Sequence, residues 1–208
     1  SRLHKDISQK LSLLEEIAKE CSVLPIAASE FGAGRGISRS EPRYQAYRRI
    51  IGPRADFLIN TIAGIHAHFS QDEERRLDQF LVLTALDCLS YELTSTSPLS
   101  YRGVNSLNCH RVNIVRRRAF TRFPYHSQLL PYPASMEQLE HWNKIRYEQW
   151  QRASGFGTEE FAELFTAENT GYSPIRQRDS IGPHGTWEVR SFDTSPLPAA
   201  LAAVAIYK

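Results

Sequence analysis

The positions of apolar residues between Thr61 and Ser70, "TIAGIHAHFS", alternate as they do in a half-buried strand. If the stretch is a strand, successive side chains point to opposite faces of the sheet. One face would then carry Thr61, Ala63, Ile65, Ala67 and Phe69, and the other Ile62, Gly64, His66 and His68. The pattern predicts an apolar face toward the core and an opposite face that carries two imidazoles.

A second strand is predicted at "GTWEVRSFD", residues 185–193. Alternation places Thr186, Glu188, Arg190 and Phe192 on one face and Trp187, Val189 and Ser191 on the other. Glu188 and Arg190 could form an ordinary solvent-facing ion pair. They could also join His66 and His68 in an active-site sheet, where an acid holds a metal and an arginine holds an anion.

Helical spacing of apolar residues from Leu3 to Ile17 predicts an amphipathic helix that ends near Cys21 and packs into the core. Further helices are expected after a Ser70–Glu73 capping box, from Ser135 with Gln138 at its third position, from Thr158, and from Ser195 with Pro196. The helix from Ser135 would turn Leu139, Trp142, Ile145 and Trp150 inward. Strands and helices in this irregular order favour an α+β fold.

Residues 27–45 are rich in Gly and Ser and are predicted to form a loop. Their GAGRG fits neither a Walker loop nor GxGxxG, so its spacing alone gives little support for a phosphate-binding loop.

The composition suits one large globular domain, since the chain has 208 residues of which 41% are hydrophobic. We expect residues 1–208 to form a single catalytic-type domain that is incomplete at both ends, because the last helix lacks a stop signal. The 25 basic and 23 acidic residues give a net charge of +2, which argues against a dedicated nucleic-acid binder. No stretch resembles a secretory signal or a membrane span, and the scattered Cys21, Cys88 and Cys109 favour a cytoplasmic protein with reduced thiols.

Four stretches in order also resemble a known family, over the chain from about Arg43 onward. They are "GIHAHFS", "STSPLSYRGVNSLNCHR", "SPIRQRD" and "GTWEVRSFD". They are similar to the GxHVHVG, SANSPFW-x-GRDTG-x-x-SYR, Arg-Pro and GTVEVRVCD motifs of carboxylate-amine ligases of the glutamate-cysteine ligase type two family. The resemblance implies a glutamine-synthetase-like fold, in which an antiparallel sheet forms a half-barrel with helices outside.

The resemblance also implies a reaction, in which ATP and Mg²⁺ are used to join a carboxylate, commonly that of glutamate, to an amine. The partners would be small-molecule substrates, without nucleic acid or membrane, and a homo-oligomer is compatible with this reading. Carried over by position, Glu188 becomes the metal ligand and Arg111 and Arg190 become catalytic anion clamps. His66 and His68 would orient substrate or phosphate, and Arg176 and Arg178 would add to the nucleotide side.

The sequence departs from the family pattern at Thr96, at Leu99 and Ser100, in "YRGVNS", and at His110. The two closely spaced metal-binding glutamates of the family's first strand are also not found before the first helix. These departures suggest an incomplete view of a longer protein or a homologue that has lost catalysis and acts as a binding protein.

Two further classes of protein remain open. The HxH strand could supply two histidine ligands to the zinc ion of a hydrolase, although no neighbouring motif indicates the third protein ligand that such a site needs. The basic stretch "HRVNIVRRRAF" could contact nucleic acid, or it could be a solvated, partly anion-binding loop.

Overall fold

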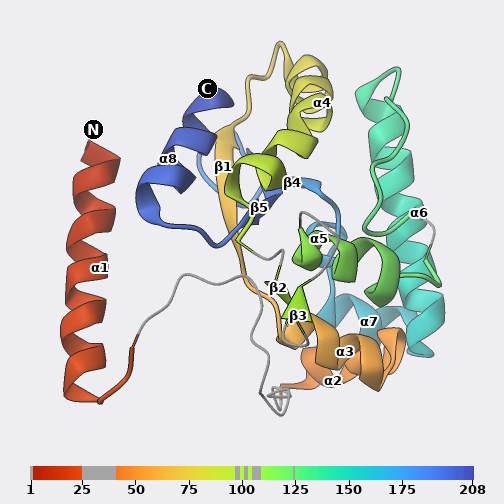
Figure 1. Ribbon diagram of the computed structural model, residues 1–208. Coiled ribbons are helices and arrows are strands. Elements are labelled where there is room, and N and C mark those ends of the chain that lie inside the picture. Colours follow the sequence, from red (N-terminus) through yellow and green to blue (C-terminus); the bar gives the residue numbers. More distant parts are fainter. Residues whose placement is uncertain (1, 25–40, 97–98, 101–102, 105–108, 124) are drawn as a thin grey trace.

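The computed structural model describes residues 2–24, 41–96, 99–100, 103–104, 109–123 and 125–208, and Figure 1 shows their arrangement. Its helices are α1 (Arg2–Glu20), α2 (Pro42–Ile51), α3 (Pro53–Asn60), α4 (Arg76–Thr94), α5 (His110–Ile114), α6 (Met136–Ser154), α7 (Thr158–Leu164) and α8 (Leu197–Ile206). A π-helical turn η1 (Val115–Ala119) continues α5, and a 3₁₀ turn η2 (Ala167–Asn169) follows α7. The strands are β1 (Gly64–Ser70), β2 (Leu99–Ser100), β3 (Gly103–Val104), β4 (Ile175–Arg178) and β5 (Thr186–Asp193). The fold is α+β, as predicted.

The main sheet is antiparallel and has the order β1-β5-β4, with the last strand in the sequence at its centre. Both predicted strands are present, as β1 and β5. The described strands form an open sheet instead of the expected half-barrel, and β2 and β3 pair separately as a short ladder.

A β-bulge interrupts the pairing of β1 with β5. The pairs on either side of it are Ile65 with Phe192 and Ala67 with Val189. His66 therefore lies opposite two residues, Arg190 and Ser191. An extra residue on one strand reverses the alternation of faces beyond it.

The reversal corrects the predicted face of Phe192. This ring lies in the same apolar cluster as Trp187 and Val189, although it was expected beside Glu188 and Arg190. Ser191 keeps its predicted side and donates to Asp87 of α4 at 2.6 Å. The bulge thus turns both Ser191 and Phe192 toward the covering helices.

Two apolar clusters hold the fold together. One lies between the apolar face of the sheet and helices α4 and α8, and includes Phe80, Leu83, Trp187, Phe192 and Ala203. The other is aromatic, joins α2, α3, η1, α6 and α7, and includes Phe120, Phe123, Trp150, Phe161 and Phe165. Helix α6 passes along the β4 edge and contributes to both, through Leu139 and Trp150 respectively.

The predicted helix starts are partly confirmed. Helix α6 begins after Ser135, whose side chain accepts from the Gln138 backbone as expected, and α7 begins at Thr158. Helix α4 begins only at Arg76, so the proposed Ser70–Glu73 box is wrong. Helix α2 begins at Pro42, inside the predicted loop, because proline at the first helical position lacks the amide hydrogen that would be unpaired there. Helix α8 has Pro196, not Ser195, as its cap.

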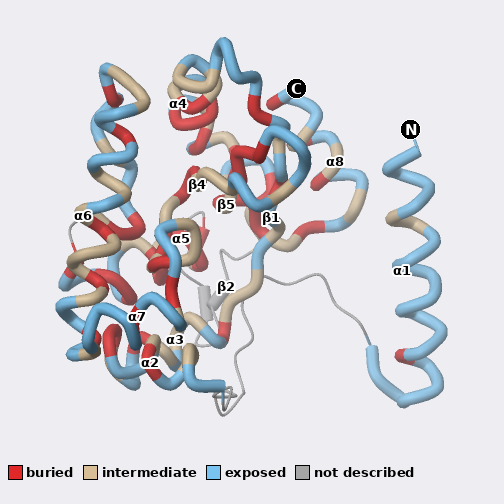
Figure 2. The backbone as a smooth tube through the Cα atoms, turned by 180° about the vertical axis from the view of Figure 1, so that it is seen from behind, coloured by how far each residue is buried: buried red, intermediate tan, exposed pale blue. Residues whose placement is uncertain are grey.

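Helix α1 does not pack its apolar stripe into a core formed by the described residues. Figure 2 shows α1 coloured as exposed along most of its length. Only Ala18 of this helix is buried, while Leu14 and Ile17 stay about half exposed, at 50% and 48%. The core packing expected for this helix is therefore wrong. None of the helices in the described ranges is both long and apolar enough to span a lipid bilayer.

A buried ion pair fixes the end of β5 to α5. Arg111 is 3% exposed, and its Nε donates to the Asp193 carboxylate at 2.8 Å. Its Nη2 donates to the backbone oxygens of Phe192 at 2.9 Å and Arg190 at 3.3 Å. Asp193 also accepts from the Cys109 thiol, and its backbone N–H donates to the Thr94 hydroxyl. Asp193 thus ties together α4, α5 and β5, through its backbone N–H to α4 and its carboxylate to α5.

The first glycine of the GxHxH stretch owes its identity to the same pair. A Cβ at Gly64 would lie 2.7 Å from Cζ of Arg111 and 2.9 Å from the Phe192 carbonyl oxygen. Both distances are below van der Waals contact, and the backbone oxygen cannot move aside cheaply. Only glycine lets β1 run this close to the buried guanidinium.

Replacing Arg111 by methionine should destabilise the fold by about 3–5 kcal/mol, because Asp193 is left as an unpaired buried charge. Chemical denaturation followed by circular dichroism measures the free energy of unfolding. Arg75→Met is the matched control, since Arg75 is exposed, and it should change stability by less than about 0.5 kcal/mol. Equal stability of the Arg111 and Arg75 variants would show that the buried pair does not hold the fold.

Candidate functional site

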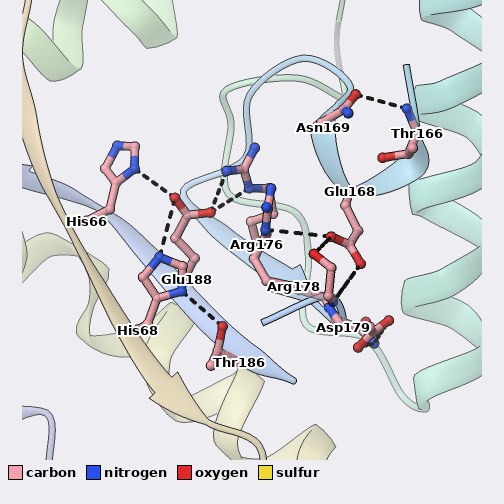
Figure 3. A network of polar contacts seen from close by, with 12 residues as sticks. His66, His68, Thr166, Glu168, Asn169, Arg176, Arg178, Asp179, Thr186 and Glu188 are labelled. Carbon is pink, nitrogen blue, oxygen red and sulfur yellow. Dashed lines mark hydrogen bonds and ion pairs between the residues drawn. The ribbon is translucent and has the colours of Figure 1, made fainter. Parts of the chain in front are cut away.

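The sheet face opposite α4 and α8 is polar across all three strands. Its side chains are His66 and His68 from β1, Arg176 and Arg178 from β4, and Thr186, Glu188 and Arg190 from β5. Figure 3 shows the contacts that join most of them. The structure confirms that the histidine face of β1 and the Glu188 face of β5 lie together.

Glu188 is the centre of this face. Its side chain is 3% exposed, and its Oε1 lies 2.7 Å from Nδ1 of His66. Its Oε2 accepts from Nε of Arg176 at 2.6 Å, and Nε of Arg190 lies 3.6 Å from Oε1. Burial alone raises the pKa of Glu188, but the His66 hydrogen bond and the charges of Arg190 and Arg176 outweigh it and lower this pKa. The carboxylate therefore stays ionised.

The geometry assigns a protonation state to His66. A carboxylate only accepts hydrogen bonds, so Nδ1 of His66 carries the proton that is donated to Glu188. Burial lowers the pKa of His66, and the Glu188 hydrogen bond opposes this without cancelling it. His66 is thus a neutral donor at neutral pH.

His68 lies beside it with a different partner. Its Nδ1 is 2.9 Å from the Thr186 hydroxyl, and its Nε2 is 4.0 Å from Oε1 of Glu188. The side chains of His66 and His68 remain 37% and 33% exposed, so each presents part of its ring to solvent or a ligand.

Arg190 is held by stacking more than by hydrogen bonds. Its guanidinium lies over the ring of Tyr172, with Cζ 4.3 Å from the ring centroid. Its Nε and Nη1 are buried and have no hydrogen-bond partner among the described residues. A buried donor without a partner is costly, which makes this arginine a candidate for binding an anion.

Arg146 of α6 is a second arginine with an unused donor, and the sequence analysis did not identify it. It is 5% exposed, its Nη2 donates to Asn143 at 2.8 Å, and its Nε has no partner in the described ranges. Burial, together with the positive charges of Arg176 and Arg190, lowers the pKa of Arg146 to about 10. The same influences, with Arg190 as the repelling charge, lower the pKa of Arg176 to about 10. Both guanidiniums remain charged at neutral pH.

The sequence did contain a signal for Arg146. The buried positions of α6 are Leu139, Arg146, Trp150 and Ser154, a helical stripe in which an arginine is the exception. A charged residue at a position that the period assigns to the core needs a buried partner or a ligand.

A pocket of about 330 Å³ opens beside these arginines, between α6, η2 and β4. Arg146, Lys144 and Arg176 line it together with Tyr147 and Glu168. Its volume lies in the range of small-molecule sites, which is about 300–1,000 Å³.

Two predicted site residues lie elsewhere. Arg178 extends away from Glu188 toward Glu168, with Nε 3.6 Å from its carboxylate. Arg111 is occupied by Asp193 and two backbone oxygens inside the protein, so the expected clamp on a substrate is wrong for this conformation. Arg111 differs from the prediction because it is buried, and its Nε and Nη2 already donate to groups of the protein itself.

The predicted metal role of Glu188 has little support in the geometry. Both of its oxygens face nitrogen donors, and the described residues contain no cluster of three or more His, Cys, Asp or Glu side chains that could hold a metal ion. Magnesium is usually bound by oxygen ligands in octahedral geometry, and one carboxylate paired with arginine does not provide this. The GAGRG sequence and Ser97 and Pro98 of the family pattern lie outside the described residues.

Comparison with family models, with curated proteins and with solved structures found no match.

Replacing Glu188 by glutamine should lower the pKa of His66 further, because the charge that favours the imidazolium is lost. The ring nitrogen shifts of His66, followed by NMR between pH 4 and pH 8, measure this. In the parent protein the His66 midpoint should lie below the ordinary histidine value of about 6.5. Exposed His141 on α6 is the control, and its titration should be the same in both proteins.

The sign of the pH effect follows from the same shift. Since the folded-state pKa of His66 is lowered, the unfolded chain binds more protons as the pH falls below about 6.5, and stability is lost there. A His66 midpoint above that value, or one that Glu188→Gln leaves in place, would contradict the assigned hydrogen bond.

Proposed function

We propose that the polar face of the sheet is the anion-binding part of an ATP-dependent carboxylate-amine ligase. The observation that carries the proposal is an imbalance of charge. The guanidiniums of Arg176 and Arg190 share the single carboxylate of Glu188, and the nearby Arg146 has no ion pair with a described carboxylate. An anionic ligand would offset the remaining positive charge and satisfy the unused donors.

The resemblance to glutamate-cysteine ligases suggests which anions these are. In such a reaction a substrate carboxylate, commonly that of glutamate, attacks the terminal phosphorus of ATP, and ADP leaves. The resulting acyl phosphate is then attacked by an amine, which forms the amide bond and releases inorganic phosphate. Both steps place negative charge on phosphoryl oxygens, and positioned arginines stabilise that charge.

The residues divide this work according to their positions. Arg190 and Arg146 have unused donors and would contact phosphoryl or carboxylate oxygens directly. Arg176 is engaged by Glu188 through Nε and Nη2, which holds it in the sheet face and fixes the direction of Nη1. His66 and His68 keep exposed ring edges beside the carboxylate, where each could hydrogen-bond a substrate.

Magnesium, which the family resemblance implies, does not fit the described residues, for the reasons given above. No step of the proposed chemistry is therefore assigned to a metal bound by Glu188. This favours a second candidate function, that of a ligase homologue that binds the anionic substrate without catalysis. A zinc-dependent hydrolase is less favoured, since His66 and His68 both face Glu188 and lack a third ligand among the described side chains.

We also propose that the protein is cytoplasmic. Its three cysteines are free, which suits a reducing compartment.

Replacing Arg190 by glutamine should weaken the binding of ADP or inorganic phosphate at this face at least about tenfold, a loss of roughly 1.4 kcal/mol. Isothermal titration of the full chain measures this affinity, and a parallel melting curve checks the fold. Arg152→Gln on the exposed side of α6 is the matched control and should bind as the parent does. Arg146→Gln tests the pocket between α6, η2 and β4, which Arg190 does not line.

Release of phosphate from ATP separates the two candidate functions. A ligase should release phosphate only when magnesium, glutamate and an amine are all present, and Arg190→Gln should reduce the rate. A binding protein should retain the affinity difference between Arg190→Gln and Arg152→Gln without any turnover. Equal affinity of these two variants would contradict both functions.

A further inference from the structure

A second basic surface lies away from the Glu188 face. It is a groove of about 630 Å³ between α3 and the α5–η1 segment, and no acidic residue lines it. Arg54, Arg117 and Arg118 supply its charge, and Ile51, Ala55 and Leu58 supply an apolar wall. The groove shares no lining residue with the pocket beside Arg146 and Arg176.

The arginines of the groove differ from their neighbours in lacking partners. Arg116 is paired with buried Asp87, and Arg49 lies over the Phe156 ring at 4.9 Å. Arg54, Arg117 and Arg118 are exposed and have no ion pair or side-chain hydrogen bond with another described residue. Three like charges around one groove repel one another, so an anion placed among them would be stabilised.

The backbone fixes two of these arginines in place. Val115 and Ala119, the first and last residues of the π-helical turn η1, are both buried in the aromatic cluster. The residues between them are therefore held at the surface by anchors on both sides. Turns of this kind are rare in proteins and occur frequently at functional sites.

We propose that this groove binds a small organic polyanion, with phosphate or carboxylate groups on the arginines and an apolar part against Ile51, Ala55 and Leu58. Guanidinium forks match the oxygens of both groups, and the volume lies in the range of small-molecule sites, about 300–1,000 Å³. The apolar wall distinguishes this groove from a surface that tracks a nucleic-acid backbone, for which a much more basic domain is typical. The overall charge of +2 also opposes a nucleic-acid partner.

Protection of the arginines from chemical modification tests the proposal directly. Phenylglyoxal reacts with accessible guanidiniums, and mass spectrometry of peptides locates each modified residue. ADP has both phosphates and a planar apolar base, so it should slow the modification of Arg117 and Arg118 at least about tenfold, with tripolyphosphate less effective. Adenosine should give no protection, and exposed Arg75 and Arg152 should react at the same rate throughout.

Variants separate this groove from the Glu188 face. ADP should still protect Arg117 and Arg118 in the Arg190→Gln protein, whatever happens at the first site. The double variant Arg117→Gln/Arg118→Gln should lose protection at Arg54, while Arg75→Gln/Arg152→Gln, with the same change in charge, should keep it.

Three results would overturn the proposal. One is the same modification rate of Arg117 and Arg118 with and without ADP. Another is protection that extends equally to Arg75 and Arg152, which would indicate nonspecific screening. The third is stronger protection by a single-stranded oligonucleotide than by ADP, which would assign the groove to nucleic acid.

Discussion

The ion pair between Arg111 and Asp193 is the contact on which the geometry of the sheet depends. It joins the end of the central strand to α5, and the Asp193 backbone N–H donates to the Thr94 hydroxyl of α4. A charge pair removed from water is stable only when its remaining hydrogen-bonding atoms are also satisfied. Here the backbone oxygens of Phe192 and Arg190 accept from the same guanidinium, so the pair also fixes the path of β5 just beyond the bulge.

Charges are balanced differently on the Glu188 face of the sheet than in the buried Arg111–Asp193 pair. Arg111 is neutralised by its partner and turned inward, whereas Arg190 and Arg146 retain unused donors. Arg111 and Arg146 are both buried, and Arg190 is only 13% exposed at its side chain, so burial alone does not tell the two kinds of arginine apart. The distinction comes from the partners: the structural arginine meets a carboxylate and two carbonyls, whereas Arg190 shares Glu188 with Arg176, and Arg146 donates only to the Asn143 side chain among the described residues.

Much of the polar face could be predicted from the sequence, because a period of two residues assigns each side chain to a face without knowledge of the fold. This period brought together His66, His68, Glu188 and Arg190. It failed at Phe192, because a bulge depends on how two distant strands pair and leaves no sign in either strand alone. The sequence also could not show that Arg111 is structural and Arg190 is available to a ligand. Both match family positions, and only the fold decides which of them is enclosed.

Helices showed the same limit. The cap at Ser135 is local chemistry and was predicted, while α2 was missed because Gly and Ser upstream of Pro42 extended the loop interpretation too far. Arg146 belongs to a predicted helix, but its role depends on β4 and β5, which approach that helix from elsewhere in the sequence. A single sequence does not tell which residues that are distant along the chain lie close together in the fold.

The bulge opposite His66 also determines how β5 tolerates changes in length. Before the bulge, the strand directs its charged side chains to the polar face; after it, Phe192 faces the helices. Deleting Ser191 would restore a regular ladder in which Phe192, now directly after Arg190, still lies opposite Ile65 and faces the helices. The same deletion would remove the hydroxyl that donates to buried Asp87 of α4. Losing this residue would therefore remove a hydrogen bond between the sheet and α4 without reversing the faces of β5.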